Sequence, residues 1–230
     1  MQQVKQVDQK TQKLLEVVYE NANDSMGFVP NSMRTMPHEP KLFFGFSMMS
    51  LSIFSVPVKK LLHFKRIIPL LRFLKWGLSN DKETISLELR SLVAFASSIS
   101  SGCLYCQAHM GAASSKYGAS QEKLDNILNF EDSELYSESE KAAISIAFAA
   151  ARIPNETTAE HFSRLRKYFD DRQIVNIVGV ISYFGFLNRW NDTMSTQLEP
   201  ETTEFGSKSL GALDWNIGDH DSAFDPVKAK

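Results

Sequence analysis

Apolar residues recur at three- and four-residue intervals along most of the chain, which is the period of an amphipathic helix. Between residues 9 and 22, for example, Leu14, Leu15 and Val18 fall on one face. The strict alternation of apolar and polar residues that marks a strand is hard to find. Predicted helices cover residues 9–22, 41–54, 81–101, 103–117, 120–128, 138–152, 157–169 and 172–197. The pattern therefore predicts an all-α protein with about seven or eight helices.

Several helix ends are marked by particular residues. Gly102 and Gly118 stand where helices are expected to stop, because glycine adopts the left-handed conformation of a helix C-terminus without steric cost. Ser137, followed three residues later by Glu140, predicts a capping box at a helix start. Asp81 is the expected N-cap of the most apolar helix before the cysteines.

The apolar periodicity stops near residue 205. From Gly206 onward the chain is polar and aperiodic. We therefore expect a single helical domain over residues 1–205 and an extended C-terminal tail over residues 206–230, whose Trp215 and Phe224 are apolar enough to contact a neighbouring subunit.

Two apolar segments raise the question of a membrane. Residues 42–58 carry no charge over 17 positions, close to the length of a span, but four serines and Pro57 interrupt them. Residues 57–76 mix basic and apolar side chains and are broken at Pro69. We expect helices that pack in the protein, with no membrane partner. Because the first residues also lack the apolar run of a secretory signal, a cytoplasmic location is expected.

Charge excludes one large class of partner. The chain has 25 Lys and Arg against 27 Asp and Glu, a net charge of −2. Affinity for nucleic acid depends mainly on neutralising phosphates with an excess of basic side chains. No nucleic-acid partner is therefore expected.

The candidate chemistry lies in the only two cysteines, Cys103 and Cys106, at a predicted helix start. A gap of two residues lets both thiols on a first helical turn form a disulfide, and the positive end of the helix dipole favours thiolate. His109, about one turn further on nearly the same face, is placed to accept or stabilise a thiol proton. In a reducing cytosol a cysteine pair is usually catalytic or transient rather than structural. The spacing therefore predicts a redox-active pair.

Other uses of this motif are less favoured. A structural zinc site wants four ligands, whereas the two cysteines and His109 supply three and the other histidines show no ligand spacing. Covalent haem attachment needs histidine directly after the second cysteine, where this chain has Gln107. A pair of inert buried cysteines remains open. No metal and no cofactor are expected.

The segment resembles the carboxymuconolactone decarboxylase / alkylhydroperoxidase D family, in particular its peroxidase-related branch. The matching motif is Gly102-Cys-Leu-Tyr-Cys-Gln-Ala-His109, after a buried helix that ends in small residues. Further similarity lies at residues 27–31 (GFVPN), 39–40 (EP) and 183–192 (YFGFLNRWND). The resemblance spans about residues 25–200.

The resemblance implies an all-α bundle of the alkylhydroperoxidase D-like type, homo-oligomers and thiol-dependent peroxidase activity. By analogy with the family, Cys106 attacks the peroxide and becomes a sulfenic acid, and Cys103 resolves it as a disulfide. A thiol or dithiol donor of unknown identity then reduces the pair. A glutamate and a histidine relay protons in that scheme.

The chain departs from the family pattern at both relay positions. The family histidine falls four residues after the second cysteine, where this chain has Met110, so His109 differs by about 100° in direction. The family glutamate falls at Ser91, and Glu88, one turn earlier, is the candidate substitute. Tyr105 stands where some members have a histidine.

Three functions follow from these observations. The first is a thiol-dependent peroxidase or disulfide reductase that takes peroxide or a small hydroperoxide. The second is a non-catalytic redox-sensing or interaction protein of the same fold. The third is a cofactor-free lyase like the carboxymuconolactone decarboxylases, with His109 as general base.

Overall fold

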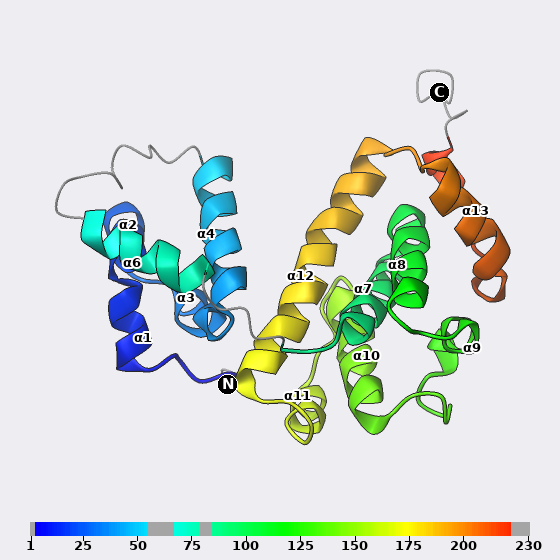
Figure 1. Ribbon diagram of the computed structural model, residues 1–230, viewed down its shortest axis with the longest axis horizontal. Helices are drawn as coiled ribbons and strands as arrows, with labels where there is room; N and C mark the ends of the chain where they lie inside the picture. Colours follow the sequence, from blue (N-terminus) through cyan, green and yellow to red (C-terminus); the bar gives the residue numbers. More distant parts are fainter. Residues whose placement is uncertain (1–2, 55–66, 79–83, 222–230) are drawn as a thin grey trace. The chain divides into compact units, whose positions relative to one another are not determined.

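A computed structural model of the chain describes residues 3–54, 67–78 and 84–221. These residues form 12 α-helices and no strand (Figure 1). The helices are α1 Gln9–Leu14, α2 Glu16–Met26, α3 Ser32–Thr35, α4 Pro40–Ile53, α6 Ile67–Leu78, α7 Leu87–Ser101, α8 Leu104–Lys116, α9 Gln121–Asp125, α10 Glu138–Ala151, α11 Ala159–Leu165, α12 Asp171–Met194 and α13 Pro200–Ser209. Short 3₁₀-helices are η1 Met36–His38, η3 Ile127–Asn129, η4 Gly211–Leu213 and η5 Gly218–His220. The predicted all-α fold is confirmed.

The helix count exceeds the prediction because one expected helix is divided and three helices, α3, α6 and α13, lie outside the eight predicted ranges. Leu15 has φ −97° and ψ 5°, ends α1 and precedes α2, so the single helix expected over residues 9–22 is two. At the other end of the chain α12 stops at Met194, since Ser195 has a positive φ of 45°. Helix α7 starts later than expected, with Ser86 as its N-cap; Asp81 lies outside the described residues.

The chain divides into two compact units rather than one domain over residues 1–205. One unit comprises residues up to Thr84 together with Asp170–Asn176, and the other comprises Ile85–Phe169 together with the chain from Ile177 onward. The division places both cysteines and every residue of the candidate site in the second unit.

The first unit is held together by aromatic contacts between α4 and α6. The rings of Phe43 and Phe73, both buried, pack edge to face with centroids 6.2 Å apart. Beyond its buried face α4 is open to solvent, and Phe54, directly after its last residue, is 78% exposed. Within the described part of the chain, no helix combines the length and apolar character needed to cross a membrane. Residues 55–66, which carry much of the predicted basic amphipathic stretch, lie outside the described residues.

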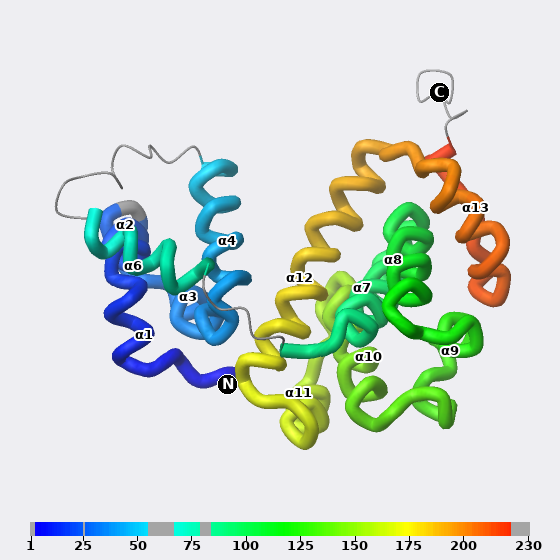
Figure 2. Tube along the Cα trace, in the orientation of Figure 1, coloured from blue at the N-terminus to red at the C-terminus, as the bar shows by residue number. Residues whose placement is uncertain are grey.

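Helix α7 is the centre of the second unit. It packs against α8 and α10, as the tube trace in Figure 2 shows. Leu92, Val93, Phe95 and Ala96 are fully buried in these contacts, in agreement with the apolar pattern of the sequence. The expected capping box at the start of α10 is present. This packing holds the end of α7, and therefore the start of α8, in a rigid environment.

The predicted extended tail over residues 206–230 is wrong for its described part. Helix α13 crosses the expected boundary, and η4 and η5 continue the fold to His220, which is 4% exposed. Two contacts anchor this segment on α8. The indole Nε1 of Trp215 donates a hydrogen bond to the Leu104 carbonyl oxygen at 2.9 Å, and Gly218 lies against Leu104 with a φ of +53°. This segment therefore folds against α8 through a few scattered apolar residues, although its apolar residues do not recur at helical spacing.

We expect the Gly206→Ala substitution to destabilise this anchorage. A Cβ at this position would lie 2.6 Å from the nearest Trp215 ring carbon, so the ring must move and its bond to Leu104 is weakened. Alanine favours the helix over glycine by about 1 kcal/mol. Overpacking against the Trp215 ring costs roughly 1–3 kcal/mol, so we expect the free energy of unfolding to fall. Thermal unfolding followed by circular dichroism measures it. The matched control is Gly185→Ala in α12, where a Cβ meets nothing within 4 Å and which should stabilise.

Candidate active site

Both cysteines lie at the junction of α7 and α8. Gly102 ends α7 in the left-handed conformation at φ 79°, and its backbone reversal places Cys103 as the N-cap of α8. The Cys103 Sγ accepts a hydrogen bond from the Cys106 backbone N–H at 3.3 Å. Both thiols are free and buried, with exposures of 0% for Cys103 and 2% for Cys106. The local sequence thus positions two sulfurs on one turn at a helix N-terminus.

The two thiols differ in acidity because they share a hydrogen bond. The pKa of Cys106 is lowered, chiefly because the Cys103 thiol donates to its sulfur, and the Asn191 amide Nδ2 donates as well at 3.4 Å; burial opposes the shift. The pKa of Cys103 is raised, first by that same bond to Cys106, then by burial, by the charge of Cys106 and by a hydrogen bond to Asp192. The arrangement keeps the thiolate on Cys106 and the proton on Cys103.

We expect this acidity to appear in the pH dependence of Cys106 alkylation. Iodoacetamide reacts with the thiolate, so in a Cys103→Ser background the rate should fall as the pH drops through the lowered pKa of Cys106. Serine retains the hydroxyl donor and the N-cap oxygen. Adding Asn191→Leu removes one donor to the sulfur and should raise the pKa of Cys106, moving the profile to higher pH. The exposed Asn155→Leu serves as the control; an unmoved profile in the Asn191 variant would contradict the assignment.

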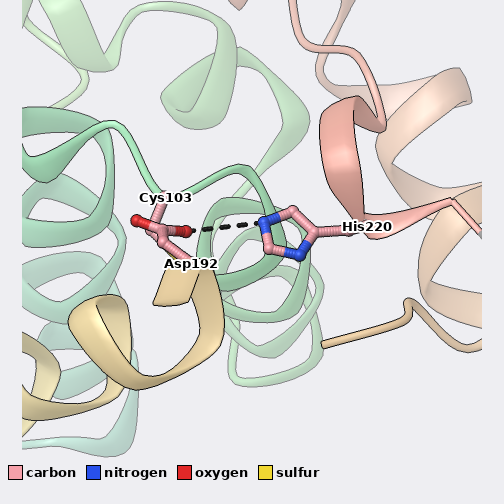
Figure 3. Close-up of side chains that lie close together, drawn as sticks. All are labelled: Cys103, Asp192 and His220. Atoms are coloured by element: carbon pink, nitrogen blue, oxygen red, sulfur yellow. Dashed lines mark ion pairs between the residues drawn. The ribbon is translucent and has the colours of Figure 1, made fainter. Parts of the chain in front are cut away.

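Asp192 and His220 lie beside Cys103 and come from two other segments of the chain, as Figure 3 shows. The His220 Nε2 lies 3.4 Å from the Asp192 Oδ1. The Cys103 Sγ, an Asp192 carboxylate oxygen and a His220 ring nitrogen all lie within 4.8 Å of one another. The His220 Nδ1 is 2.8 Å from the Thr196 carbonyl oxygen. Since a carbonyl only accepts, Nδ1 carries the proton and Nε2 faces the carboxylate.

A second polar cluster lies on the outer side of α8. Glu199 accepts hydrogen bonds from the Tyr105 hydroxyl at 3.1 Å and from the His109 Nε2 at 2.9 Å. Burial raises the pKa of Glu199, but its own backbone N–H, the charge of His109 and these two bonds together leave it lowered. The pKa of Tyr105 is raised to about 12 by burial and by the charge of Glu199. The Tyr105 ring also lies 4.4 Å from the ring of His109 and 5.6 Å from that of His220, centroid to centroid.

These contacts decide where the predicted relay residues lie. His109 is on α8 as expected, but its ring pairs with Glu199. Met110, at the position of the family histidine, packs against the cluster that contains both cysteines. The 100° difference between neighbouring helical positions therefore places the methionine near the thiols and the histidine at the Glu199 cluster.

Glu88 does not reach the thiols. It lies in the first turn of α7, whereas the cysteines follow the last turn, roughly 20 Å away along a helix of this length. Its carboxylate instead binds the Lys123 Nζ at 2.9 Å, and the same ammonium binds Glu140 at 2.6 Å. The prediction that Glu88 replaces the family glutamate is wrong, and its role is structural.

Four site residues escaped the sequence interpretation. Asn191 and Asp192 belong to a segment recognised only as similar to the family, and no role was assigned to them. Glu199 and His220 lie after the last predicted helix. The one available signal was the run of polar residues 188–192 at the end of an otherwise apolar helix, because polar residues there need a buried partner.

A pocket of ≈ 560 Å³ borders this site. Its wall includes Asp192, whose carboxylate also lies near the Cys103 sulfur. Apolar side chains and two arginines form much of the remainder: Ile99, Leu128, Phe148, Arg152, Ile153 and Arg189. Asp192, which is 44% exposed, is therefore shared by the pocket wall and the group of side chains beside Cys103.

The second unit is all-helical where it is described, and its CxxC pair lies where the buried helix α7 ends and α8 begins. Residues 70–149 match the sequence model of the Carboxymuconolactone decarboxylase family. The predicted resemblance to this family is confirmed.

Three comparisons with particular proteins extend the match. The Bacillus subtilis (strain 168) protein described as uncharacterized protein YdfG is 24% identical over 111 residues, which are 48% of this chain and 74% of that protein. The crystal structure of the apo debrominase Bmp8 is similar at 26% identity and a TM-score of 0.53, covering 91% of this chain and 97% of Bmp8. A cysteine-to-alanine variant of Bmp8 in complex with 2,3,4-tribromopyrrole is similar at 25% identity and a TM-score of 0.53, covering 90% and 97%.

Proposed function

We propose that the protein is a thiol-dependent peroxidase in which Cys106 is the nucleophile and Cys103 the resolving thiol. The observation that carries the proposal is the shared hydrogen bond, which lowers the pKa of Cys106 and raises that of Cys103. A peroxidase of this kind needs one thiolate and one retained thiol proton side by side. The family match supports the proposal.

In the first step the Cys106 thiolate attacks the terminal oxygen of a hydroperoxide. The sulfur–oxygen bond forms as the O–O bond breaks, the sulfur is oxidised to a sulfenic acid, and the alkoxide leaves and takes a proton to become an alcohol or water. The Asn191 amide and the Cys103 thiol, which hold the thiolate before the attack, orient its sulfur.

In the second step Cys103 displaces the hydroxyl of the sulfenic acid. Its proton passes to the Asp192–His220 pair and from there to the departing hydroxide, which leaves as water while the disulfide forms. An external dithiol then reduces the disulfide by exchange through a mixed disulfide. Asp192 and His220 thus take the acid–base role for which His109 and Glu88 were expected, while His109 pairs with Glu199.

Burial of the sulfurs favours a small oxidant. Cys106 is only 2% exposed, so a folded protein disulfide cannot reach it in this arrangement. Hydrogen peroxide and small organic hydroperoxides are compact enough to pass the Asp192 side chain, which is 44% exposed. Peroxide is therefore the better supported substrate class than a protein disulfide.

The direct test counts thiols. Fully reduced protein is mixed with an equimolar amount of hydrogen peroxide or cumene hydroperoxide, and free thiols are titrated under denaturing conditions. We expect two thiols to disappear per peroxide consumed. An unchanged thiol count in the wild-type protein would refute the peroxidase proposal.

The likeness to Bmp8 supports a second candidate, reductive debromination. Replacing an aryl bromine by hydrogen needs two electrons and a proton and yields bromide and a disulfide, which is the capacity of one dithiol. The adjoining pocket offers apolar side chains, among them Ile99, Leu128 and Phe148, against which a halogenated ring could pack. The same thiol titration with 2,3,4-tribromopyrrole in place of peroxide, together with measurement of bromide, distinguishes the two substrates.

The other two hypotheses remain separable from these. A redox sensor would consume peroxide slowly and change its assembly when oxidised, without turnover on a dithiol donor. A lyase with His109 as general base would retain activity in the double variant Cys103→Ser, Cys106→Ser, and the Glu199 carboxylate beside the His109 ring is compatible with that role.

The predicted homo-oligomer, the electron donor and the cytoplasmic location stay predictions. The place where we expect self-association is the outer face of α12, where Tyr183, Phe186, Trp190 and Met194 follow helical spacing and are each at least 42% exposed. Light scattering after size-exclusion chromatography measures the subunit number.

A further inference from the structure

Three potential metal ligands converge beside the thiol pair from segments far apart in the chain. Cys103 caps α8, Asp192 lies near the end of α12 and His220 ends η5 (Figure 3). One ligand atom from each lies within 4.8 Å of the other two. Sequence spacing suggests a different set, Cys103, Cys106 and His109. His220 could not be foreseen, because only the folded C-terminal segment brings it to the site.

The His220 ring is oriented as a ligand. Its Nδ1–H donates to the Thr196 carbonyl, so in the neutral ring the lone pair of Nε2 is directed at Asp192. Backbone carbonyls commonly hold the far nitrogen of metal-bound histidines in this way. The Nε2–Oδ1 separation of 3.4 Å is longer than the usual 2.7–3.2 Å of an N–H···O hydrogen bond. A lone pair and a carboxylate that face each other are stabilised by a cation between them.

The donor set and the spacing suit zinc. Bonds of about 2.0–2.3 Å in a tetrahedral site place neighbouring ligand atoms roughly 3.3–3.7 Å apart. The histidine and carboxylate atoms are 3.4 Å apart, and the Cys103 sulfur lies within 4.8 Å of both. Thiolate, imidazole and carboxylate together favour Zn²⁺ over hard ions such as Mg²⁺ and Ca²⁺. Three protein ligands leave a fourth position for water or for the neighbouring Cys106 sulfur.

We propose that Cys103, Asp192 and His220 bind one Zn²⁺ and that metal binding and disulfide formation exclude each other. Binding displaces the Cys103 proton, so this sulfur no longer donates to Cys106 and no longer resolves the sulfenic acid while it is bound. Once Zn²⁺ dissociates and Cys103 regains its proton, its sulfur attacks the Cys106 sulfenic acid; the S–S bond forms as the S–O bond breaks, and the hydroxide takes that proton and leaves as water. The site therefore holds either a metal or an active dithiol, which goes beyond the peroxidase proposal.

The test uses Co²⁺ as a spectroscopic probe for the zinc site. Reduced, chelator-treated wild-type protein is titrated anaerobically with Co²⁺ while absorbance is recorded. We expect one equivalent to bind, with a thiolate-to-cobalt charge-transfer band, visible bands of the intensity typical of four-coordinate cobalt, and loss of both when Zn²⁺ is added. Absence of the charge-transfer band at millimolar Co²⁺ would overturn the proposal.

Variants assign the ligands and separate this proposal from the peroxidase proposal. Cys103→Ser should abolish the charge-transfer band, and His220→Gln should weaken Co²⁺ binding by at least about tenfold. His161→Gln, an exposed histidine at the start of α11, should bind as the wild type does. Cys106→Ser should still bind Co²⁺ although it cannot react with peroxide. A band that survives both Cys103→Ser and His220→Gln would place the metal elsewhere and refute the site.

Discussion

The Cys106→Ser variant should lose peroxide-dependent thiol oxidation almost completely. Serine has nearly the same shape, but its hydroxyl does not ionise near neutral pH, so the group that Cys103 and Asn191 hold as an anion is gone. Removing the nucleophile of a covalent mechanism lowers the rate by several orders of magnitude, and we expect a loss of about 10³-fold or more. Stopped-flow measurement of peroxide consumption at equal protein concentration gives the rate.

The partner variant Cys103→Ser is the matched control. It retains the nucleophile and a hydroxyl at the N-cap, so it should consume one equivalent of peroxide and stop at the Cys106 sulfenic acid. Dimedone captures that species, and mass spectrometry locates it. If Cys103→Ser were inert and Cys106→Ser reacted at the wild-type rate, the roles of the two cysteines would be exchanged.

The His220→Gln variant should separate the two chemical steps. Glutamine can still bond to the Thr196 carbonyl, but it cannot carry the Cys103 proton to the departing hydroxide. A positioned general acid–base contributes about 10²–10⁴-fold, so we expect disulfide formation to slow by that factor while peroxide consumption in the first turnover is nearly unchanged. The Cys106 sulfenic acid should therefore accumulate, and quenched-flow trapping with dimedone measures its lifetime. Chelator-treated protein is used, so that metal binding does not contribute.

Two comparisons keep this result interpretable. His161→Gln changes a surface histidine that caps α11 and should leave the sulfenic acid lifetime as in the wild type. A variant that merely loosens the C-terminal segment, such as Gly206→Ala, should change both steps together rather than the second alone. An unchanged lifetime in His220→Gln would remove His220 from the mechanism.

Local sequence signals predicted much of the second unit. Gly102 and the two-residue gap between Cys103 and Cys106 affect only the backbone within about one helical turn. The end of α7 and the start of α8 therefore lie where the sequence predicted them. The capping box of Ser137 and Glu140 and the buried face of α7 are equally local. Such features depend on neighbours three or four residues away, which a sequence displays directly.

The partners of the thiols are a different case. From the sequence alone, Ser91 holds the family position and Glu88, one turn earlier on the same helix face, is the candidate substitute. Only the ion pairs of Lys123 with Glu88 and Glu140 show that Glu88 is engaged at the start of α7, away from the thiols. Likewise His109 and Met110 are neighbours, and the position of Glu199 decides which way the histidine turns.

By itself the sequence determined an all-helical chain, a cysteine pair at a helix start and the resemblance to a known family. Which polar side chains lie beside that pair depends on long-range packing, because Asp192 and His220 come to Cys103 only when α12 and the segment after α13 pack around α8. That packing results from the burial of dispersed apolar residues such as Trp215. These residues recur at no regular interval, and burial joins them however far apart they lie along the chain.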